Sequence, residues 1–309
     1  MTIELLDTLL FATLRAAVPL IIAGIGILIL EKSGVLNLGQ EGVLSVGAVV
    51  AFIVAYKSGS LLLACLVAAA AGVLLVLIFA WLVLYCNANQ VVTGLSLSIF
   101  GIGFSAFIGG PFIGLSIEGM PTLVTPGLSS MPVIGKVLFN QDPMTYATLV
   151  LFVAALYFLQ RTRAGMILRS VGENPQAAHA LGYSPNKVRL LALVVSGVLV
   201  ALAGSYLSLV YTPILSEGLS AGRGWIALAL VVFASHRLGR LVLGALLFGF
   251  TSIMHLVLQG MNVQIPGSIL AMMPYIITIV ALVIMSIRDR RRGIESAPKA
   301  LGHNFSASH

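Results

Sequence analysis

The sequence predicts an all-α polytopic membrane protein, on the basis of its composition and the length of its apolar runs. Of the 309 residues, 59% are hydrophobic and only 9% are charged, whereas soluble domains have roughly 45–50% apolar and about 25% charged residues. Several runs reach the length of about 20 residues that a helix needs to cross a hydrocarbon core of about 30 Å. The net charge of +7 is therefore interpreted as a sign of membrane topology and not of nucleic-acid binding.

Nine apolar segments predict about nine transmembrane helices, with eight to ten as the range. Segment 41–56 is short and segment 219–235 begins with "GLSAGRG", so either is a candidate half-helix or re-entrant piece. A broken helix is expected near residues 31–56. The nine segments are 9–30, 41–56, 60–86, 91–109, 144–160, 188–212, 219–235, 240–258 and 268–287.

Two stretches outside the apolar segments, the N-terminus and residues 110–143, have distinct compositions. The N-terminus, "MTIELLDTLLFATLR", is acidic and lacks the basic start of a signal peptide, so the first segment is expected to remain as a span. Residues 110–143 hold five of the twelve prolines and also five glycines, which disfavours regular structure. This region is predicted to be an ordered external loop.

Basic residues set the predicted orientation of the chain. Clusters at 161–189, at 236–240 and at "RDRRR" (288–292) lie next to apolar segments and are predicted to be cytoplasmic. With nine crossings, the N-terminus is then outside and the C-terminus is cytoplasmic. Residues 1–290 are predicted to be one transmembrane domain, and the polar tail 291–309 is expected to be a frayed terminus without a function.

The segment 161–190 is predicted to contain a short cytoplasmic helix. Asn174 is a favourable N-cap residue, Pro175 suits the first helical position, and Gly182 can adopt the left-handed conformation that ends a helix. These signals predict about two helical turns between two spans.

This segment, "ENPQAAHALG", resembles the coupling-helix segment of ABC-importer permeases, with Ala177, Ala178 and Gly182 at the motif positions. Three further stretches resemble the permease family that serves branched-chain amino acids, ribose and nucleosides, and they are most similar to its nucleoside type. The stretches are "EKSGVLNLGQEG" (31–42), "NANQVVTG" (87–94) and "AGRGWIALALVVFA" (221–234). The resemblance implies contacts with an ATPase at Gly172, Glu173, Asn174, Pro175, Ala177, Ala178 and Gly182.

The resemblance also implies the partners of the chain. They are one or two ABC ATPase subunits that use ATP and Mg, a second permease that is a different paralogue or a copy of this chain, and an external substrate-binding lipoprotein. The implied location is the bacterial cytoplasmic (inner) membrane, in contact with lipid. The chain has no G-x-x-x-x-G-K-[ST] motif, so ATP hydrolysis is assigned to a partner, and we expect this chain to bind no cofactor, metal or nucleic acid.

Polar residues near membrane depth are candidates for the solute pathway. Charges inside a membrane are unfavourable and usually face a cavity or a partner, and Glu41 is the best candidate for such a position. Asn37, Gln40 and Glu41 are predicted to face the pathway from a glycine-broken element, with a plain cytoplasmic loop as the alternative. Glu31 and Lys32 are predicted to form an exposed pair at the membrane surface.

Four further residues have both a pathway and a structural interpretation. Asn89, Gln90 and Thr93 offer amides and a hydroxyl that can bind solute or cap a helix. Trp225 can stack on a purine or a sugar, or anchor the chain at the membrane interface.

The predicted function is that of an ABC-importer permease for nucleosides or a related sugar-containing solute. Simple sugars and branched-chain amino acids are the alternative solutes. A second alternative is an ion-coupled secondary transporter that uses Glu31 or Glu41. An intramembrane enzyme is disfavoured because the sequence contains neither H-E-x-x-H nor paired intramembrane aspartates.

Overall fold

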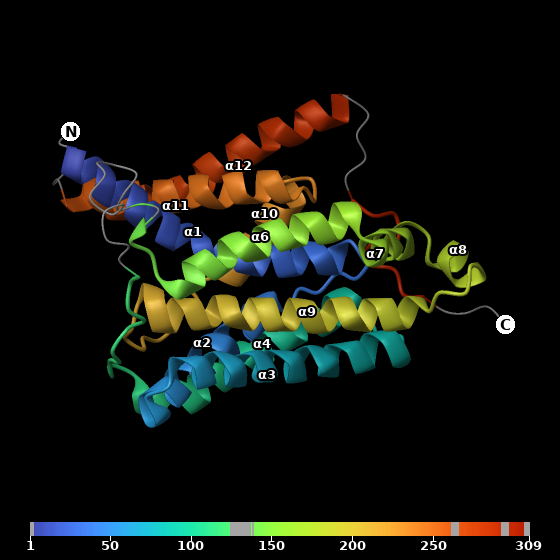
Figure 1. The fold of residues 1–309 in the computed structure, drawn as a ribbon, viewed down its shortest axis with the longest axis horizontal. Coiled ribbons are helices and arrows are strands. Elements are labelled where there is room, and N and C mark those ends of the chain that lie inside the picture. The colour runs from blue at the N-terminus through green and yellow to red at the C-terminus, as the bar shows by residue number, and fades with distance from the viewer. Residues whose placement is uncertain (1–2, 124–136, 138, 261–265, 292–296, 306–309) are drawn as a thin grey trace.

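A computed structural model describes residues 3–123, 137, 139–260, 266–291 and 297–305. Within these ranges the chain forms eleven α-helices, and its only extended pairing is an isolated bridge between Ser116 and Ile214. The long helices run roughly parallel to one another. Helix α1 begins at one end of the molecule, and the C-terminal segment (residues 297–305) lies at the other end (Figure 1).

In the part of the chain that the structure describes, seven helices are long and apolar enough to cross a membrane. Each of the nine predicted apolar segments is helical, although two of these helices have apolar parts shorter than the other seven: α10 (Arg223–Phe233) and α12 (Gly267–Arg291). The seven are α1 (Ile3–Glu31), α2 (Gln40–Ser58), α3 (Leu61–Ala80) with the π-helical segment η1 (Trp81–Tyr85), α4 (Gln90–Gly109), α6 (Pro143–Arg161), α9 (Pro185–Tyr206) with the π-helical segment η3 (Leu207–Tyr211), and α11 (Leu238–Gly260).

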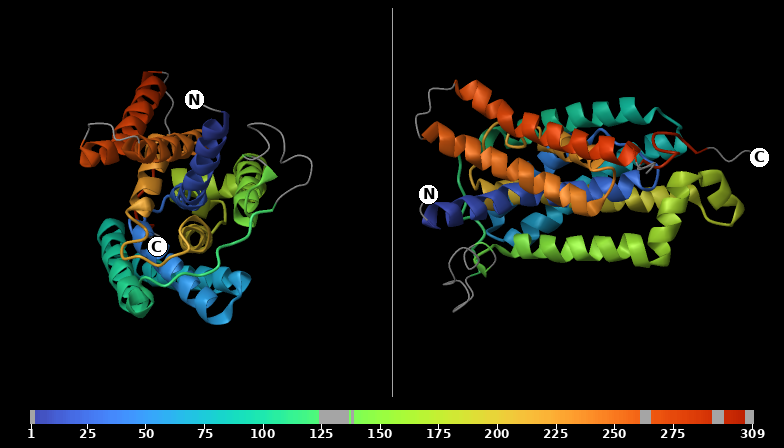
Figure 2. Two further views of the ribbon diagram at one scale, coloured as in Figure 1. Left: turned by 90° about the vertical axis from the view of Figure 1, so that its left-hand side faces the viewer. Right: turned by 90° about the horizontal axis from the view of Figure 1, so that it is seen from above.

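Helices α1, α2 and α9 form the interior of the bundle. In the most apolar window of α1, 89% of the residues are buried, and the value is 67% for α2 and α9 but only 22–33% for α3, α4, α6 and α11. Seen along the bundle, α1 and α9 lie near the middle (Figure 2). The outer helices expose large apolar side chains such as Leu62, Ile99 and Phe107, as expected for a surface that faces lipid.

Glycines allow α2 to approach its neighbours closely. A Cβ at Gly42 would lie 2.7 Å from the Leu97 carbonyl oxygen of α4, and a Cβ at Gly204 of α9 would overlap the Leu44 backbone. Because lipid tails are as apolar as the side chains, helices in a membrane associate through such close backbone packing. The position of α2 between α4 and α9 therefore depends on these small residues.

The chain between η3 and α10 re-enters the bundle. Residues 213–215 pair with residues 114–117 near the end where the N-terminus lies, through backbone hydrogen bonds that include Gly114 N to Leu215 O at 2.9 Å. The following residues then reach α2, where Ser220 contacts Ser45 and the start of α10 contacts Glu41. Helix α10 is thus a half-length helix that begins inside the bundle, as suggested for segment 219–235. The same expectation is wrong for segment 41–56, because α2 is one unbroken helix of spanning length, and the chain near residues 31–56 is interrupted only by the loop between α1 and α2.

Two short helices lie at the opposite end of the molecule. Helix α7 (Arg163–Glu173) and helix α8 (Pro175–Ala180) connect α6 to α9, and α8 projects beyond the ends of the long helices (Figures 1 and 2). Helix α8 was predicted, whereas α7 was not. The predicted external loop 110–143 begins with the short 3-10 helix η2 (Gly110–Phe112), and residues 124–136 and 138 of that loop lie outside the described residues.

Candidate functional site

The predicted capping of α8 is confirmed. The Asn174 side-chain oxygen accepts a hydrogen bond from the Ala177 N–H at 2.9 Å, and Pro175 occupies the first turn. Gly182 has a φ of +88°, and its N–H donates to the His179 carbonyl at 2.9 Å, which ends the helix. Asn174 and Gly182 therefore set the two ends of α8, the helix that projects from this end of the bundle.

The predicted coupling residues divide into an exposed group and a packed group. Glu173, Asn174, Ala177 and Gly182 are exposed, whereas Gly172, Pro175 and Ala178 are buried. Leu181 follows α8 and is 78% exposed. The exposed group, unlike the buried one, is accessible to a partner without repacking of α8.

The α1–α2 loop (residues 32–39) packs directly against the base of α7. A Cβ at Gly172 would overlap the Lys32 carbonyl, so the two backbones are in contact. Burial lowers the pKa of the Lys32 ammonium, and the negative charge of Glu173 partly offsets this effect. Movement of α7 therefore reaches the loop without an intervening side chain.

The prediction of an exposed Glu31–Lys32 pair is wrong for Glu31. Its side chain is 1% exposed and lies 2.6 Å from the His236 Nε2 atom, at the turn between α10 and α11. A buried carboxylate needs a hydrogen-bonding partner because it has lost its hydration. This contact joins the end of α1 to the end of α10.

Asn37 and Gln40 are both buried beside the α1–α2 loop. The Asn37 side-chain oxygen accepts from the Gly39 N–H at 2.8 Å, which shapes the turn into α2. Neither polar atom of Gln40 has a hydrogen-bond partner among the described residues, although the side chain is only 1% exposed. A buried amide in this state is unusual and marks a position where a polar partner is missing.

Glu41 holds the start of α10. Its carboxylate accepts hydrogen bonds from the Gly222 N–H at 3.0 Å and the Gly224 N–H at 2.6 Å. The first N–H groups of a helix have no partner within the helix and carry partial positive charge, so a carboxylate satisfies them well. Gly224 leaves no space for a side chain because a Cβ there would lie 2.6 Å from the Glu41 Cα atom.

The remaining predicted pathway residues have separate environments. Asn89 caps α4 by accepting from the Val91 and Val92 N–H groups at 3.0 and 3.1 Å. Gln90 is buried, and its oxygen accepts from the Leu36 N–H at 2.8 Å. Thr93 is half-buried on α4 and Trp225 is 37% exposed on α10. The side-chain amides of Asn89 and Gln90 thus form hydrogen bonds with other groups of the protein.

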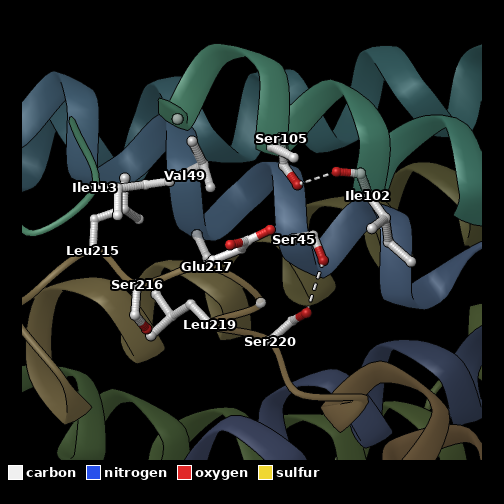
Figure 3. Close-up of a pocket in the computed structure, with 14 residues that line it drawn as sticks. Ser45, Val49, Ile102, Ser105, Ile113, Leu215, Ser216, Glu217, Leu219 and Ser220 are labelled. Carbon is white, nitrogen blue, oxygen red and sulfur yellow. Dashed lines mark hydrogen bonds between the residues drawn. The ribbon is translucent and has the colours of Figure 1, made fainter. Parts of the chain in front are cut away.

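A cavity of about 320 Å³ lies between α2, α4 and the re-entrant segment (Figure 3). The Ser45 hydroxyl donates to the Ser220 hydroxyl at 2.9 Å, and the Ser105 hydroxyl donates to the Ile102 carbonyl at 2.8 Å. The Glu217 side chain extends into the same space. The other lining residues are Ala48, Val49, Ile113, Ala106, Gly109, Leu215, Ser216, Gly218 and Leu219.

None of the predicted pathway residues lines this cavity. Sequence reasoning missed Ser45, Ser105, Glu217 and Ser220. Two features of the sequence indicate these residues: the serines inside the apolar segments of α2 and α4, and the acidic Glu217 directly before "GLSAGRG". Glu41 nevertheless borders the site indirectly, because it fixes the start of α10, three residues after Ser220, and Glu41 itself lies one turn from Ser45.

The C-terminal segment also differs from its prediction as a frayed terminus. Residues 297–305 pack against the end of the bundle that carries α7 and α8. Ala300 and Phe305 are each 8% exposed. The end of the chain is therefore part of the folded structure at this surface.

A helical membrane bundle with a cavity lined by apolar side chains and serine hydroxyls, and with a projecting helix at one end, fits a transporter subunit. The family model described as "branched-chain amino acid transport system / permease component" matches residues 9–285, and the chain belongs to this family of ABC-importer permeases. It is the permease component and not itself an ATPase. The family location is the cytoplasmic membrane, and its members work with ATPase and substrate-binding partners.

Three relatives show the range of this similarity. A protein named as a glucose ABC transporter permease of Haloferax volcanii is 36% identical over 83% of this chain and 79% of its own length. A guanosine ABC transporter permease of Bacillus subtilis is 32% identical over 91% and 92%. A nucleoside ABC transporter permease of Lactococcus lactis is 37% identical over 59% and 57%. No solved structure matches the chain.

Proposed function

We propose that this chain imports nucleosides or a related sugar-containing solute across the bacterial cytoplasmic membrane by alternating access. The observation that carries the proposal is the similarity to a guanosine permease over 91% of this chain, together with the serine-containing cavity beside the re-entrant segment. Simple sugars are the second candidate solutes because the relative with 36% identity bears a glucose name. Branched-chain amino acids are less favoured, since none of the three relatives described above bears such a name.

The cavity has the chemistry that a sugar-containing solute requires. Its hydroxyl and carboxylate groups, on Ser45, Ser105, Ser220 and Glu217, can exchange hydrogen bonds with ribose or glucose hydroxyls. The apolar walls from α2 and α4 offer contact area to a base or to a ring face. Because the Ser45–Ser220 bond joins α2 to the re-entrant segment, solute that replaces this bond would alter the contact between the two.

The driving movement is assigned to α8. When the partner ATPases close on ATP, they draw the α8 helices of the two permeases together, and α7 transmits the displacement to the α1–α2 loop. In this mechanism Asn37, Gln40 and Glu41 lie where the pathway narrows, and the unpartnered Gln40 amide gains a polar partner in another state of the cycle. Four further residues remain candidates for the pathway, although they do not line the cavity: Asn89, Gln90, Thr93 and Trp225.

The chain is proposed to cross the membrane nine times, with residues 1–290 as one domain and a cytoplasmic C-terminus. Helix α8 and the basic clusters then face the cytoplasm, and the cavity opens from the re-entrant segment toward the external face. The second permease is proposed to be a different paralogue, and an external lipoprotein delivers the solute. ATP and Mg are bound by the ATPase subunits.

The test is uptake by the complete complex in proteoliposomes with radiolabelled guanosine, glucose and leucine. Guanosine uptake is expected, and Ser220→Ala and Glu217→Gln should each reduce uptake at low concentration roughly 3- to 10-fold, because the first removes a hydroxyl and the second replaces a charged acceptor oxygen with an amide NH2 group. Ser96→Ala is the matched control, since Ser96 is exposed on α4 away from the cavity. Uptake of leucine alone, or unchanged uptake in both cavity variants, would contradict the proposal.

A further inference from the structure

The C-terminal segment is bonded to two separate elements through its backbone. The Ala300 N–H donates to the Gly172 carbonyl at 3.0 Å, at the base of α7. The Gly302 N–H donates to the Gly34 carbonyl at 3.2 Å, in the α1–α2 loop. Gly302 has a φ of +80°, which turns the segment across the loop. Two residues of one short segment thus link α7 to the loop.

Asn304 adds a connection to α4. Its side-chain oxygen accepts from the Gln90 Nε2 group at 2.9 Å, and its Nδ2 group donates to the Ala88 carbonyl at 2.9 Å. Gln90 in turn accepts from the Leu36 N–H at 2.8 Å. The two amides form a continuous bridge from the end of the chain through the first turn of α4 to the α1–α2 loop.

Arg189 binds the same segment from the start of α9. Its side chain is fully buried, and it donates to the Ser33 carbonyl at 3.3 Å and to the His303 carbonyl at 3.1 Å. A buried guanidinium requires acceptors in place of water. Among the described contacts its acceptors are main-chain carbonyls, one from the α1–α2 loop and one from the C-terminal segment.

The segment ends against α8. The Phe305 ring is 8% exposed, and its centroid lies 5.5 Å from that of His179 in an edge-to-face arrangement of 62°. Such aromatic pairs contribute beyond the area they bury. One end of the segment therefore contacts the helix assigned to the ATPase, and its middle contacts the elements next to Gln40.

We propose that residues 297–305 form a strap that carries the displacement of α8 to the α1–α2 loop and to α4. Phe305 and Asn304 are its positioning residues. The inference rests on the proposed coupling role of α8. The segment contacts α4, α7, α8, α9 and the α1–α2 loop, so it must move with these elements or lose its contacts. Coupling between distant sites travels through such contiguous contacts.

The experiment uses the complete complex and a cysteine reporter, Gln40→Cys, in a Cys65→Ala/Cys86→Ala background. The labelling rate by a small aqueous maleimide is measured without nucleotide and with ATP plus vanadate. Phe305→Ala and Asn304→Ala should each reduce the ratio between the two rates by about fivefold, as expected for the loss of one ring pair or one amide bridge. Phe305→Tyr should restore the ratio. His303→Ala is the matched control, because this exposed residue is bonded through its backbone N–H and carbonyl, both of which alanine keeps.

Assembly with the ATPase and thermal stability are measured on the same samples, so that a loss of folding is separated from a loss of transmission. An unchanged ratio in both Phe305→Ala and Asn304→Ala would overturn the strap while leaving the function of α8 intact. An absence of any ATP-dependent change with the strap unmodified would overturn the proposed coupling mechanism itself, and the strap with it. Equal loss in His303→Ala would also overturn the strap.

Discussion

At the residue scale, two buried carboxylates fasten α10 at its two ends. Glu41 of α2 accepts from the first N–H groups of α10, and Glu31 of α1 contacts His236 just after the last turn of α10. A half-length helix has few intrahelical hydrogen bonds and little area to bury, so it depends more than a full span on contacts at its termini. The acidic residues of "EKSGVLNLGQEG" therefore both have structural partners on one helix.

We expect Glu41→Ala to destabilise the protein by about 2–5 kcal/mol, because one buried and one partly buried N–H group lose a charged acceptor. Glu41→Gln should cost less, since one carbonyl oxygen remains. Thermal unfolding in detergent measures the effect, and transport should fall in parallel as α10 loses its position beside the cavity. Glu118→Ala is the control, because Glu118 is exposed. Unchanged unfolding of Glu41→Ala would exclude the capping role.

At the element scale, hydrophobic length was sufficient to predict the apolar helices. Every apolar segment is helical, and even the half-helix α10 was indicated by the glycines before it. Two features were missed for a shared reason. Helix α7 and the C-terminal segment are polar, and they are ordered by contacts with groups such as Gly34 and Gly172 that are distant in the sequence from their partners. Local composition carries no record of such contacts.

The candidate site was predicted less well than the helices. The N-cap and the terminating glycine of α8 are local signals, and both are confirmed. The partner of Glu41 lies 181 residues away in the sequence, and the cavity brings α2 and α4 together with the re-entrant segment. A sequence pattern identifies polar residues within apolar runs, but only the fold determines whether each faces a helix terminus or an open space.

The burial of residues in α8 identifies the variant that tests coupling. Ala178 is 2% exposed, so a charge there would disturb the packing of α8 itself. Glu173→Arg combined with Leu181→Glu changes only exposed side chains, and we expect uptake and ATPase stimulation to fall about tenfold or more through loss of the partner contact. Lys187→Gln, an exposed change at the same end, is the control. Normal coupling in the double variant would exclude α8 as the ATPase contact.

At the scale of the whole molecule, the number of membrane crossings determines on which side of the membrane each end of the chain lies. The seven long helices and α12 alone would make eight crossings and return the chain to the side where it began. In the proposed nine-crossing topology, the re-entrant segment and α10 together provide one more, because residues 213–215 lie near the end that holds the N-terminus and His236 lies against Glu31 at the end of α1. An odd number places the start of α1 and the C-terminal segment at opposite ends, and Figure 1 has them there.

Cysteine accessibility tests this path directly in a Cys65→Ala/Cys86→Ala background. Glu217 and Arg237 are both exposed and flank α10, so they should lie on opposite sides of the membrane. In intact cells a membrane-impermeant maleimide should label Glu217→Cys but not Arg237→Cys, which should react only after permeabilisation. Glu118→Cys and Gln176→Cys serve as the external and cytoplasmic references. Labelling of Arg237→Cys in intact cells would show that α10 does not complete a crossing, and the proposed cytoplasmic position of the C-terminal segment would then be wrong.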